Sequence, residues 1–140
     1  VPIYSERLFT DHWYGVEGSG AEAYQWTKGT HALVGFRLNR AAVDTARARL
    51  HVRAGTLQRQ TVRMYLNGMH IGKIRSASHW TPTVYRFPVD TRLLGDYNTL
   101  RFEVPGAAVP YELGVSPDRR TLGLALYWFK VTVDRGEDSQ

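Results

Sequence analysis

The sequence contains no cysteine and no long apolar run. The first absence excludes disulfide bonds and thiolate chemistry, so packing and hydrogen bonding alone must hold the fold. The second excludes a membrane-spanning helix, because no apolar stretch approaches the roughly 18 to 20 residues that crossing a bilayer requires. We therefore expect no direct membrane insertion. Residues Val1 to Tyr4 include neither an initiator methionine nor a signal segment, which predicts that the chain is a piece of a longer protein.

Motifs that carry enzyme chemistry are also missing. The histidines lack the spacing of a metal site, and there is no Gly-x-Ser-x-Gly nucleophile motif. The glycine-rich segment 15–20 lacks the Lys-Ser/Thr pair that grips phosphate and magnesium. Hydrolysis by paired carboxylates needs two acidic side chains close together, and the spacing of the acidic residues in this sequence pairs none of them. The candidates are Asp11, Glu17, Glu22, Glu112 and Asp118. The sequence therefore predicts no catalytic residue, no metal ligand and no cofactor.

The net charge of the 140-residue chain is +5, which by itself favours an acidic partner such as nucleic acid or an acidic glycan. However, Arg and Lys are spread singly along the predicted strands, as they are where charge keeps a sheet face soluble. Binding of single-stranded nucleic acid would need aromatic residues on the arginine-bearing face. Only Tyr65 is predicted to point outward there, so we do not expect a nucleic-acid partner.

Alternation of apolar and polar residues predicts β-strands. The strongest signal is Asn67-Gly68 between alternating runs at 61–66 and 69–75, because both residues tolerate the positive φ of a type I′ hairpin turn. From residue 46 another strand is predicted, with one buried and one solvent-facing side. Its outward side chains are Arg47, Arg49, His51 and Arg53.

The whole pattern predicts an all-β fold. The run Leu122 to Phe129 is apolar on both faces, as in a central strand, and a buried helix is the competing interpretation. Short helical stretches are predicted only near 38–46 and 91–95. Seven to nine short strands then imply a two-sheet antiparallel β-sandwich, similar to a jelly roll. A single domain is expected over residues 1–140, with its core at about 12–134 and a polar tail at 135–140.

Large aromatic residues gather near the start of the chain, in a glycine-rich segment where the backbone can fold tightly. With one carboxylate they form the set Trp13, Tyr14, Glu17, Tyr24 and Trp26. Such sets bind sugars, because an aromatic ring covers the C–H face of a pyranose while polar side chains bind its hydroxyls. The alternative is that Trp26 and Tyr24 plug one end of the core. Trp80, in a polar link, adds either to the same surface or to the opposite end of the core.

A loop of about 14 residues precedes the last strand, and loops of that length are usually functional or tie two parts of a fold together. Near its end, residues 116–120 are Ser-Pro-Asp-Arg-Arg. Asp118 beside two arginines is typical of an ion pair that anchors the loop. Contact with a ligand is the alternative, with Arg119 or Arg120 available to an acidic sugar.

Four short segments, taken in order, are similar to one family. They are Gly15-x-Glu17…Tyr24-x-Trp26, Val62-x-Met64-x-Leu66-Asn67-Gly68-x-x-Ile71-Gly72, Asn98-x-Leu100-x-Phe102 and Leu113-Gly114-x-Ser116-x-Asp118-x-Arg120-x-Leu122-Gly123. Together they resemble the galactose-binding-like β-sandwich accessory domains found beyond the membrane spans of bacterial cell-envelope glycosyltransferases. The resemblance implies a jelly-roll module outside the cytoplasm that binds or positions glycan and performs no chemistry itself. Related sandwiches sometimes hold a structural calcium ion, but the sequence offers no cluster of oxygen ligands for one.

These observations lead to two functional hypotheses. The first is a non-catalytic carbohydrate-binding or substrate-positioning module, whose partners are a glycan or polysaccharide and the rest of a larger membrane-associated polypeptide. Its predicted ligand-binding residues are Trp13, Tyr14, Glu17, Tyr24, Trp26, Trp80, Arg119 and Arg120. Only Glu17 and Trp26 among them match motif positions of the family. The second is a structural interaction domain that docks on a partner protein through the face bearing Arg47, Arg49 and Arg53.

Overall fold

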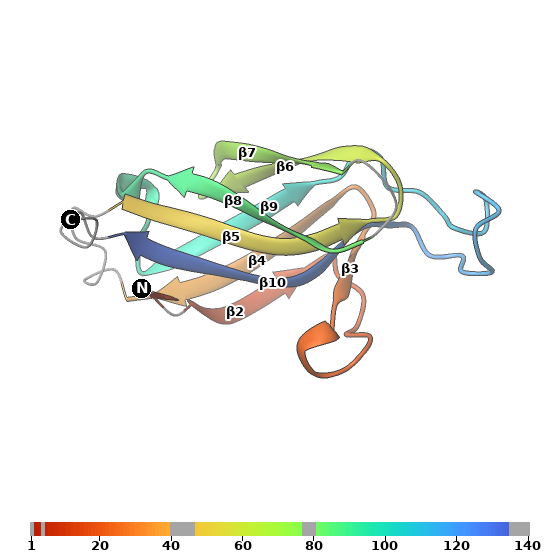
Figure 1. The fold of residues 1–140 in the computed structure, drawn as a ribbon, viewed down its shortest axis with the longest axis horizontal. Helices are drawn as coiled ribbons and strands as arrows, with labels where there is room; N and C mark the ends of the chain where they lie inside the picture. Colours follow the sequence, from red (N-terminus) through yellow and green to blue (C-terminus); the bar gives the residue numbers. More distant parts are fainter. Residues whose placement is uncertain (1, 4, 40–46, 77–80, 135–140) are drawn as a thin grey trace.

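Two antiparallel sheets packed face to face form the protein (Figure 1). The structure is a computed structural model, and it describes residues 2–3, 5–39, 47–76 and 81–134. Sheet A has the order β1 (Pro2–Ile3), β10 (Leu122–Asp134), β5 (Arg47–Thr56) and β8 (Thr83–Val89), and β3 (Gln25–Lys28) also pairs with β10. Sheet B has the order β2 (Ser5–Asp11), β4 (His31–Leu38), β9 (Tyr97–Glu103), β6 (Gln60–Leu66) and β7 (Met69–Ser76). The predicted all-β sandwich is confirmed.

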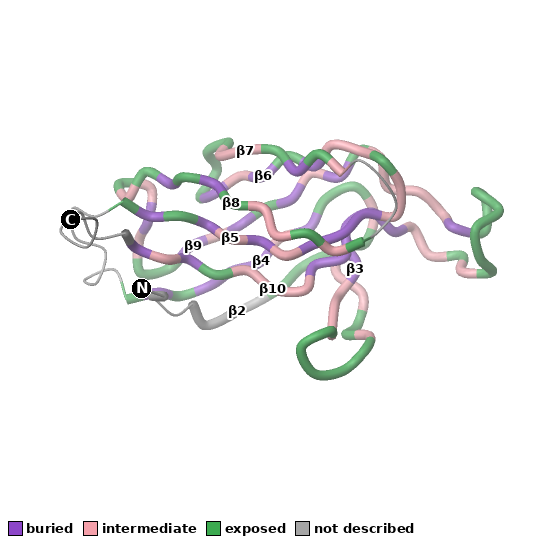
Figure 2. The backbone as a smooth tube through the Cα atoms, viewed as in Figure 1, coloured by how far each residue is buried: buried purple, intermediate pink, exposed green. Residues whose placement is uncertain are grey.

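The hydrophobic core lies between the sheets, and the alternation of each strand decides which side chains enter it. In β5 the side chains at even positions from Ala48 to Ala54 are buried, while Arg47 and Arg49 are exposed. The same period of two buries Val62, Met64 and Leu66 in β6. Figure 2 shows the buried stretches along the strands, interrupted by intermediate and exposed ones.

The Asn67-Gly68 hairpin forms as predicted. The φ angles are 50° at Asn67 and 85° at Gly68, the left-handed values that the turn requires. The turn sets Leu66 opposite Met69 and joins β6 to β7. The short helical stretch predicted at 91–95 is the 3-10 helix η3 (Thr91–Leu93). The stretch predicted at 38–46 falls mostly outside the described residues, and Leu38 itself ends β4.

One strand differs from the sequence-based expectations. Strand β2 lies before residue 12, where the sequence predicts no strand, because its short run lacks alternation and is fixed by pairing with β4. The last strand, β10, is central in sheet A, as predicted for the apolar run Leu122 to Phe129, and it is a strand rather than the competing buried helix. Trp128 lies opposite Arg53 on the outward, arginine-bearing side of the sheet, and the ammonium of Lys130 lies 5.3 Å from its ring centroid.

Two long connections extend from the same end of the sandwich (Figure 1). One joins β2 to β3 and contains the 3-10 helix η1 (Gly20–Glu22). The other is the segment 105–121 between β9 and β10, which we call the 105–121 loop. At the opposite end, β1 pairs with the last residues of β10. Over the residues that are described, no helix has the length and apolar character needed to cross a membrane.

Candidate functional site

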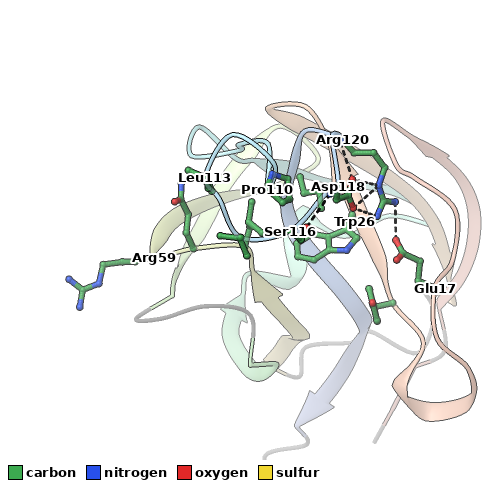
Figure 3. A pocket seen from close by; sticks show the side chains of 13 residues that line it. Glu17, Trp26, Arg59, Pro110, Leu113, Ser116, Asp118 and Arg120 are labelled. Atoms are coloured by element: carbon green, nitrogen blue, oxygen red, sulfur yellow. Dashed lines mark hydrogen bonds and ion pairs between the residues drawn. The ribbon is translucent and has the colours of Figure 1, made fainter.

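A pocket of about 890 Å³ opens between the two long connections and the β5–β6 turn (Figure 3). Three chain segments line it. Its lining residues are Glu17, Tyr24, Trp26, Leu57, Gln58, Arg59, Pro110, Leu113, Val115, Ser116, Asp118, Arg120 and Leu122. The structure thus brings together four of the predicted ligand-binding residues, since Glu17, Tyr24, Trp26 and Arg120 all line this pocket.

Backbone pairing between segments 12–17 and 24–28 places the first wall. Glu17 and Tyr24 exchange two N–H···O=C hydrogen bonds of 2.9 Å, so their side chains emerge side by side. The N–H of Tyr14 donates to the carbonyl of Trp26 at 3.0 Å, which continues the ladder. Strand β3 then sets Trp26 opposite Ala125 of β10 and so anchors this wall to sheet A.

The floor of the pocket belongs to a small second hydrophobic cluster. Trp26, Leu122 and Ala125 are its buried members, and Tyr24 packs against them. The indole of Trp26 is only 4% exposed and meets the Tyr24 ring edge to face, with 6.2 Å between the centroids. Both hypotheses for these aromatics therefore apply in part, because Trp26 closes the end of the core while Tyr24, which is half-buried, lines the open space.

Hydrogen bonds within the 105–121 loop hold the second wall. Ala108 and Leu122 exchange two backbone hydrogen bonds at its base, of 2.9 and 2.8 Å. Farther out, the N–H of Tyr111 donates to the carbonyl of Asp118 at 2.8 Å. The loop therefore has internal structure, and it carries exposed Leu113 (44%) and Val115 (65%) to the mouth of the pocket.

Arg120 links the two walls through an ion-pair cluster. Its guanidinium donates to Asp118 Oδ2 at 2.7 Å and to Glu17 Oε2 at 3.0 Å, as the dashed lines in Figure 3 show. The backbone N–H of Arg120 also donates to Asp118 Oδ1 at 2.9 Å. The hydrogen bonds from Arg120 to Asp118, those of its side chain above all, lower the pKa of Asp118 below its ordinary value. The ion pair predicted for Asp118 is confirmed.

Replacing Asp118 with asparagine should reduce stability at neutral pH by about 1 kcal/mol, because the pair is partly solvated. The pKa of Asp118 is lowered from 3.8, so the ionised form stabilises the fold above pH 3.8. That stabilisation is lost as the pH falls below 3.8 and then passes the lower pKa that Asp118 has in the folded protein. The difference in free energy of unfolding between wild type and Asp118→Asn should therefore shrink as the pH of the urea titrations is lowered below 3.8.

Asp90→Asn is the matched control, because Asp90 also pairs with an arginine two residues later in the chain. Nη2 of Arg92 lies 2.8 Å from Oδ2 of Asp90. Hydrogen exchange of the Tyr111 amide should become faster in Asp118→Asn and stay unchanged in Asp90→Asn. Equal exchange in both variants would show that the ion pair does not hold the loop.

The other predicted residues lie apart from the pocket lining. The indole N–H of Trp13 donates to the carbonyl of Leu33 at 2.9 Å, and its ring packs against Phe102 of the main core. Tyr14 lies beneath the guanidinium of Arg120, 5.0 Å from Cζ to the ring centroid. Arg119 is exposed and stacks on Tyr111 at 3.7 Å. Trp80 falls outside the described residues.

Sequence reasoning did not identify most of the lining. Leu57, Gln58 and Arg59 come from the β5–β6 turn, and Leu113 and Val115 come from the 105–121 loop. The sequence signals for the loop residues are the length of that loop and, for Leu113, its position in one of the family-like segments. Within the described part of the chain, no group of three or more His, Asp or Glu side chains could hold a metal ion.

The arginine-bearing face of sheet A lies outside the pocket. Arg47 and Arg49 are exposed on it, as the docking hypothesis requires. Arg53 differs, because both of its terminal nitrogens donate to Glu22 at 3.0 Å and its Cζ lies 4.7 Å from the centroid of Tyr127. Arg53 therefore ties η1 to sheet A.

No protein-family model and no curated protein sequence matches this chain. Solved structures that are similar to it include carbohydrate-binding modules with a β-sandwich fold. A family 35 carbohydrate-binding module from Clostridium thermocellum has a TM-score of 0.49 at 12% identity, covering 94% of this chain and 99% of its own. CBM29_1, a family 29 module from Piromyces equi, also has a TM-score of 0.49 at 12% identity, covering 91% and 80%.

A third similar structure is the carbohydrate-binding module CBM36 in complex with calcium and xylotriose. Its TM-score is 0.47 at 9% identity, and the match covers 94% of this chain and 93% of that one. Identities and scores this low transfer neither a ligand nor a site residue to this chain.

Proposed function

We propose that this protein is a non-catalytic carbohydrate-binding or substrate-positioning module whose ligand lies in the pocket between the 105–121 loop and segment 12–28. The observation that carries the proposal is the pocket itself. It combines a half-buried aromatic ring, Tyr24, with exposed aliphatic side chains and with carboxylate acceptors fixed by Arg120. An apolar surface for C–H groups beside oriented hydroxyl partners is what recognition of a pyranose requires.

The charges of the pocket favour a neutral sugar. Arg120 is shared by Glu17 and Asp118, so two carboxylates and one guanidinium leave this cluster with one negative charge. Arg119 stacks on Tyr111 rather than lining the pocket, and Arg59 extends away from the other labelled side chains in Figure 3. An acidic sugar placed against the cluster would meet like charge. We therefore propose neutral glycans in place of the acidic sugar expected from Arg119 and Arg120.

Binding is tested first with soluble glucan, xylan, mannan and galactan in affinity gel electrophoresis, and then by calorimetry with oligosaccharides of the best polymer. Tyr24→Ala should weaken that binding about tenfold, because it removes the ring against which the sugar lies. Leu113→Ala should weaken it several-fold without disturbing the fold, since Leu113 is exposed at the mouth.

Tyr97→Ala is the matched control. Tyr97 is 67% exposed and is the first residue of β9. The 105–121 loop begins after the last residue of that strand, so Tyr97 lies at the end of β9 away from the loop. Its removal should leave affinity within about twofold of wild type. Failure of every neutral glycan to bind, or equal losses in the Leu113 and Tyr97 variants, would reject the pocket as a sugar site.

The wider setting of the module is part of the proposal. The resemblance to accessory domains of cell-envelope glycosyltransferases supports a place outside the cytoplasm of a bacterium, within a larger membrane-associated glycan enzyme. A neighbouring domain joined next to β1 or at the end of β10 would leave the pocket open, because these strand ends pair at the opposite end of the sandwich. If no glycan binds, docking on a partner protein through exposed Arg47 and Arg49 becomes the leading function.

A further inference from the structure

A second hollow, of about 510 Å³, lies on the outer face of sheet B, next to the start of the 105–121 loop. Its lining residues are Thr30, His31, Arg63, Arg101, Glu103 and Pro105. None of them lines the first pocket. Unlike that pocket, the hollow has no large apolar side chain in its wall, and most of its lining residues are polar or charged.

Strand register places the charged groups of the hollow in adjacent rows. His31 of β4 and Arg63 of β6 both lie directly opposite Glu103 of β9. Arg101 is opposite Tyr65 in the neighbouring row. Side chains directly opposite on adjacent strands have Cβ atoms roughly 5 Å apart, so these groups face the same small space.

Internal hydrogen bonds hold Glu103 and Arg101 in place. Glu103 Oε1 accepts the hydroxyl of Tyr65 at 3.0 Å, and Oε2 accepts Arg101 Nη2 at 3.1 Å. The guanidinium of Arg101 also lies over the Tyr65 ring, with 4.6 Å from Cζ to the centroid. Because this geometry uses one N–H of Arg101, the remaining N–H groups of its planar guanidinium stay available to an acceptor.

Positive charge exceeds negative charge around the hollow. Glu103 is the one carboxylate in the lining, against Arg63 and Arg101. Lys73 lies opposite Arg63 on β7 and adds a further cation at its side. The ring of His31 packs against the ring of His12. Nδ1 of His12 lies 3.1 Å from Oδ2 of Asp11, so the carboxylate of Asp11 already faces an imidazole.

We propose that this hollow binds a small oxyanion, the carboxylate or phosphate group of a small ligand, between Arg63 and Arg101. Guanidinium forks match the oxygens of both groups, and the Tyr65–Glu103 contacts orient Arg101 before the ligand arrives. Thr30 and His31 supply further polar atoms on the opposite side of the hollow. The site does not depend on the sugar pocket, and its ligand differs in charge from the neutral glycan proposed there.

The test is a titration of the whole chain, labelled with ¹⁵N, with inorganic phosphate, glucuronate and glucose at constant ionic strength. Saturable shifts of the Thr30, His31 and Arg63 amides are expected with one or both anions and not with glucose. Phosphate alone would identify a phosphate site, and glucuronate alone would identify a carboxylate site. Arg63→Gln should weaken binding about tenfold, because it removes a charge-assisted hydrogen bond.

Arg37→Gln provides the control for general charge effects. Arg37 is exposed on the same face of sheet B, but it lies six residues along β4 from His31, which is roughly 20 Å of extended strand. Affinity should stay within about twofold of wild type in this variant. Shifts that do not saturate, equal shifts with glucose, or equal losses in both arginine variants would overturn the oxyanion site.

Discussion

Replacing Gly123 with alanine should lower the free energy of unfolding by about 3 kcal/mol, because the core has no room for the methyl group. Gly123 is buried in β10, where an added Cβ would overlap Cγ1 of Val104 and lie 3.2 Å from Oγ1 of Thr27. That hydroxyl accepts the N–H of Leu124 at 3.0 Å. A side chain at position 123 therefore strains the packing and threatens a buried hydrogen bond together.

Urea denaturation followed by tryptophan fluorescence measures the effect. Gly15→Ala is the matched substitution, since nothing lies within 4 Å of a Cβ there and Gly15 is not among the glycines with positive φ. It should leave stability within about 0.5 kcal/mol of wild type. Similar stabilities for the two variants would mean that β10 and the end of β9 pack less closely than described.

Asn67→Ala should lower the free energy of unfolding by about 2 to 3 kcal/mol, for two separable reasons. Alanine tolerates the φ of 50° poorly. The asparagine side chain also donates to the carbonyl of Leu93 at 2.7 Å and to Oδ1 of buried Asn98 at 2.9 Å, and it accepts the N–H of Thr99 at 2.8 Å. The hairpin turn is thereby joined to η3 and β9.

Asn67→Gly separates the two causes, because glycine adopts the left-handed conformation freely and lacks the side chain. Its stability, measured by the same urea titration, should fall between those of wild type and Asn67→Ala. A glycine variant as stable as wild type would show that the side-chain hydrogen bonds contribute nothing. A glycine variant no better than alanine would show that the backbone angle does not matter.

Features set by neighbouring residues could be predicted from the sequence. The Asn67-Gly68 turn depends on the conformations that two residues tolerate, and the Asp118–Arg120 pair spans two residues. Strand alternation is equally local, so the buried and exposed sides of β5 were predictable. Strand β2 was not, because its short segment has no period of its own and forms by pairing with β4.

The candidate site could be predicted only in part, because it depends on contacts between distant segments. The ion pair of Glu17 with Arg120 joins residues 103 positions apart, and no local pattern announces it. Trp13 and Trp26 belong to the same predicted aromatic set, yet Trp13 packs on the main core and Trp26 forms the pocket floor. Leu113 and Val115 line the pocket because the 105–121 loop folds back on itself through its own hydrogen bonds.

A crystal structure of the protein with an oligosaccharide of the best-bound neutral glycan tests the proposed function most directly. We predict a sugar ring in the pocket of about 890 Å³, against Tyr24 and within hydrogen-bonding distance of the Glu17–Arg120–Asp118 cluster. A sugar found instead over Trp128 on the outward face of sheet A, or on the outer face of sheet B, would contradict the assignment of the pocket.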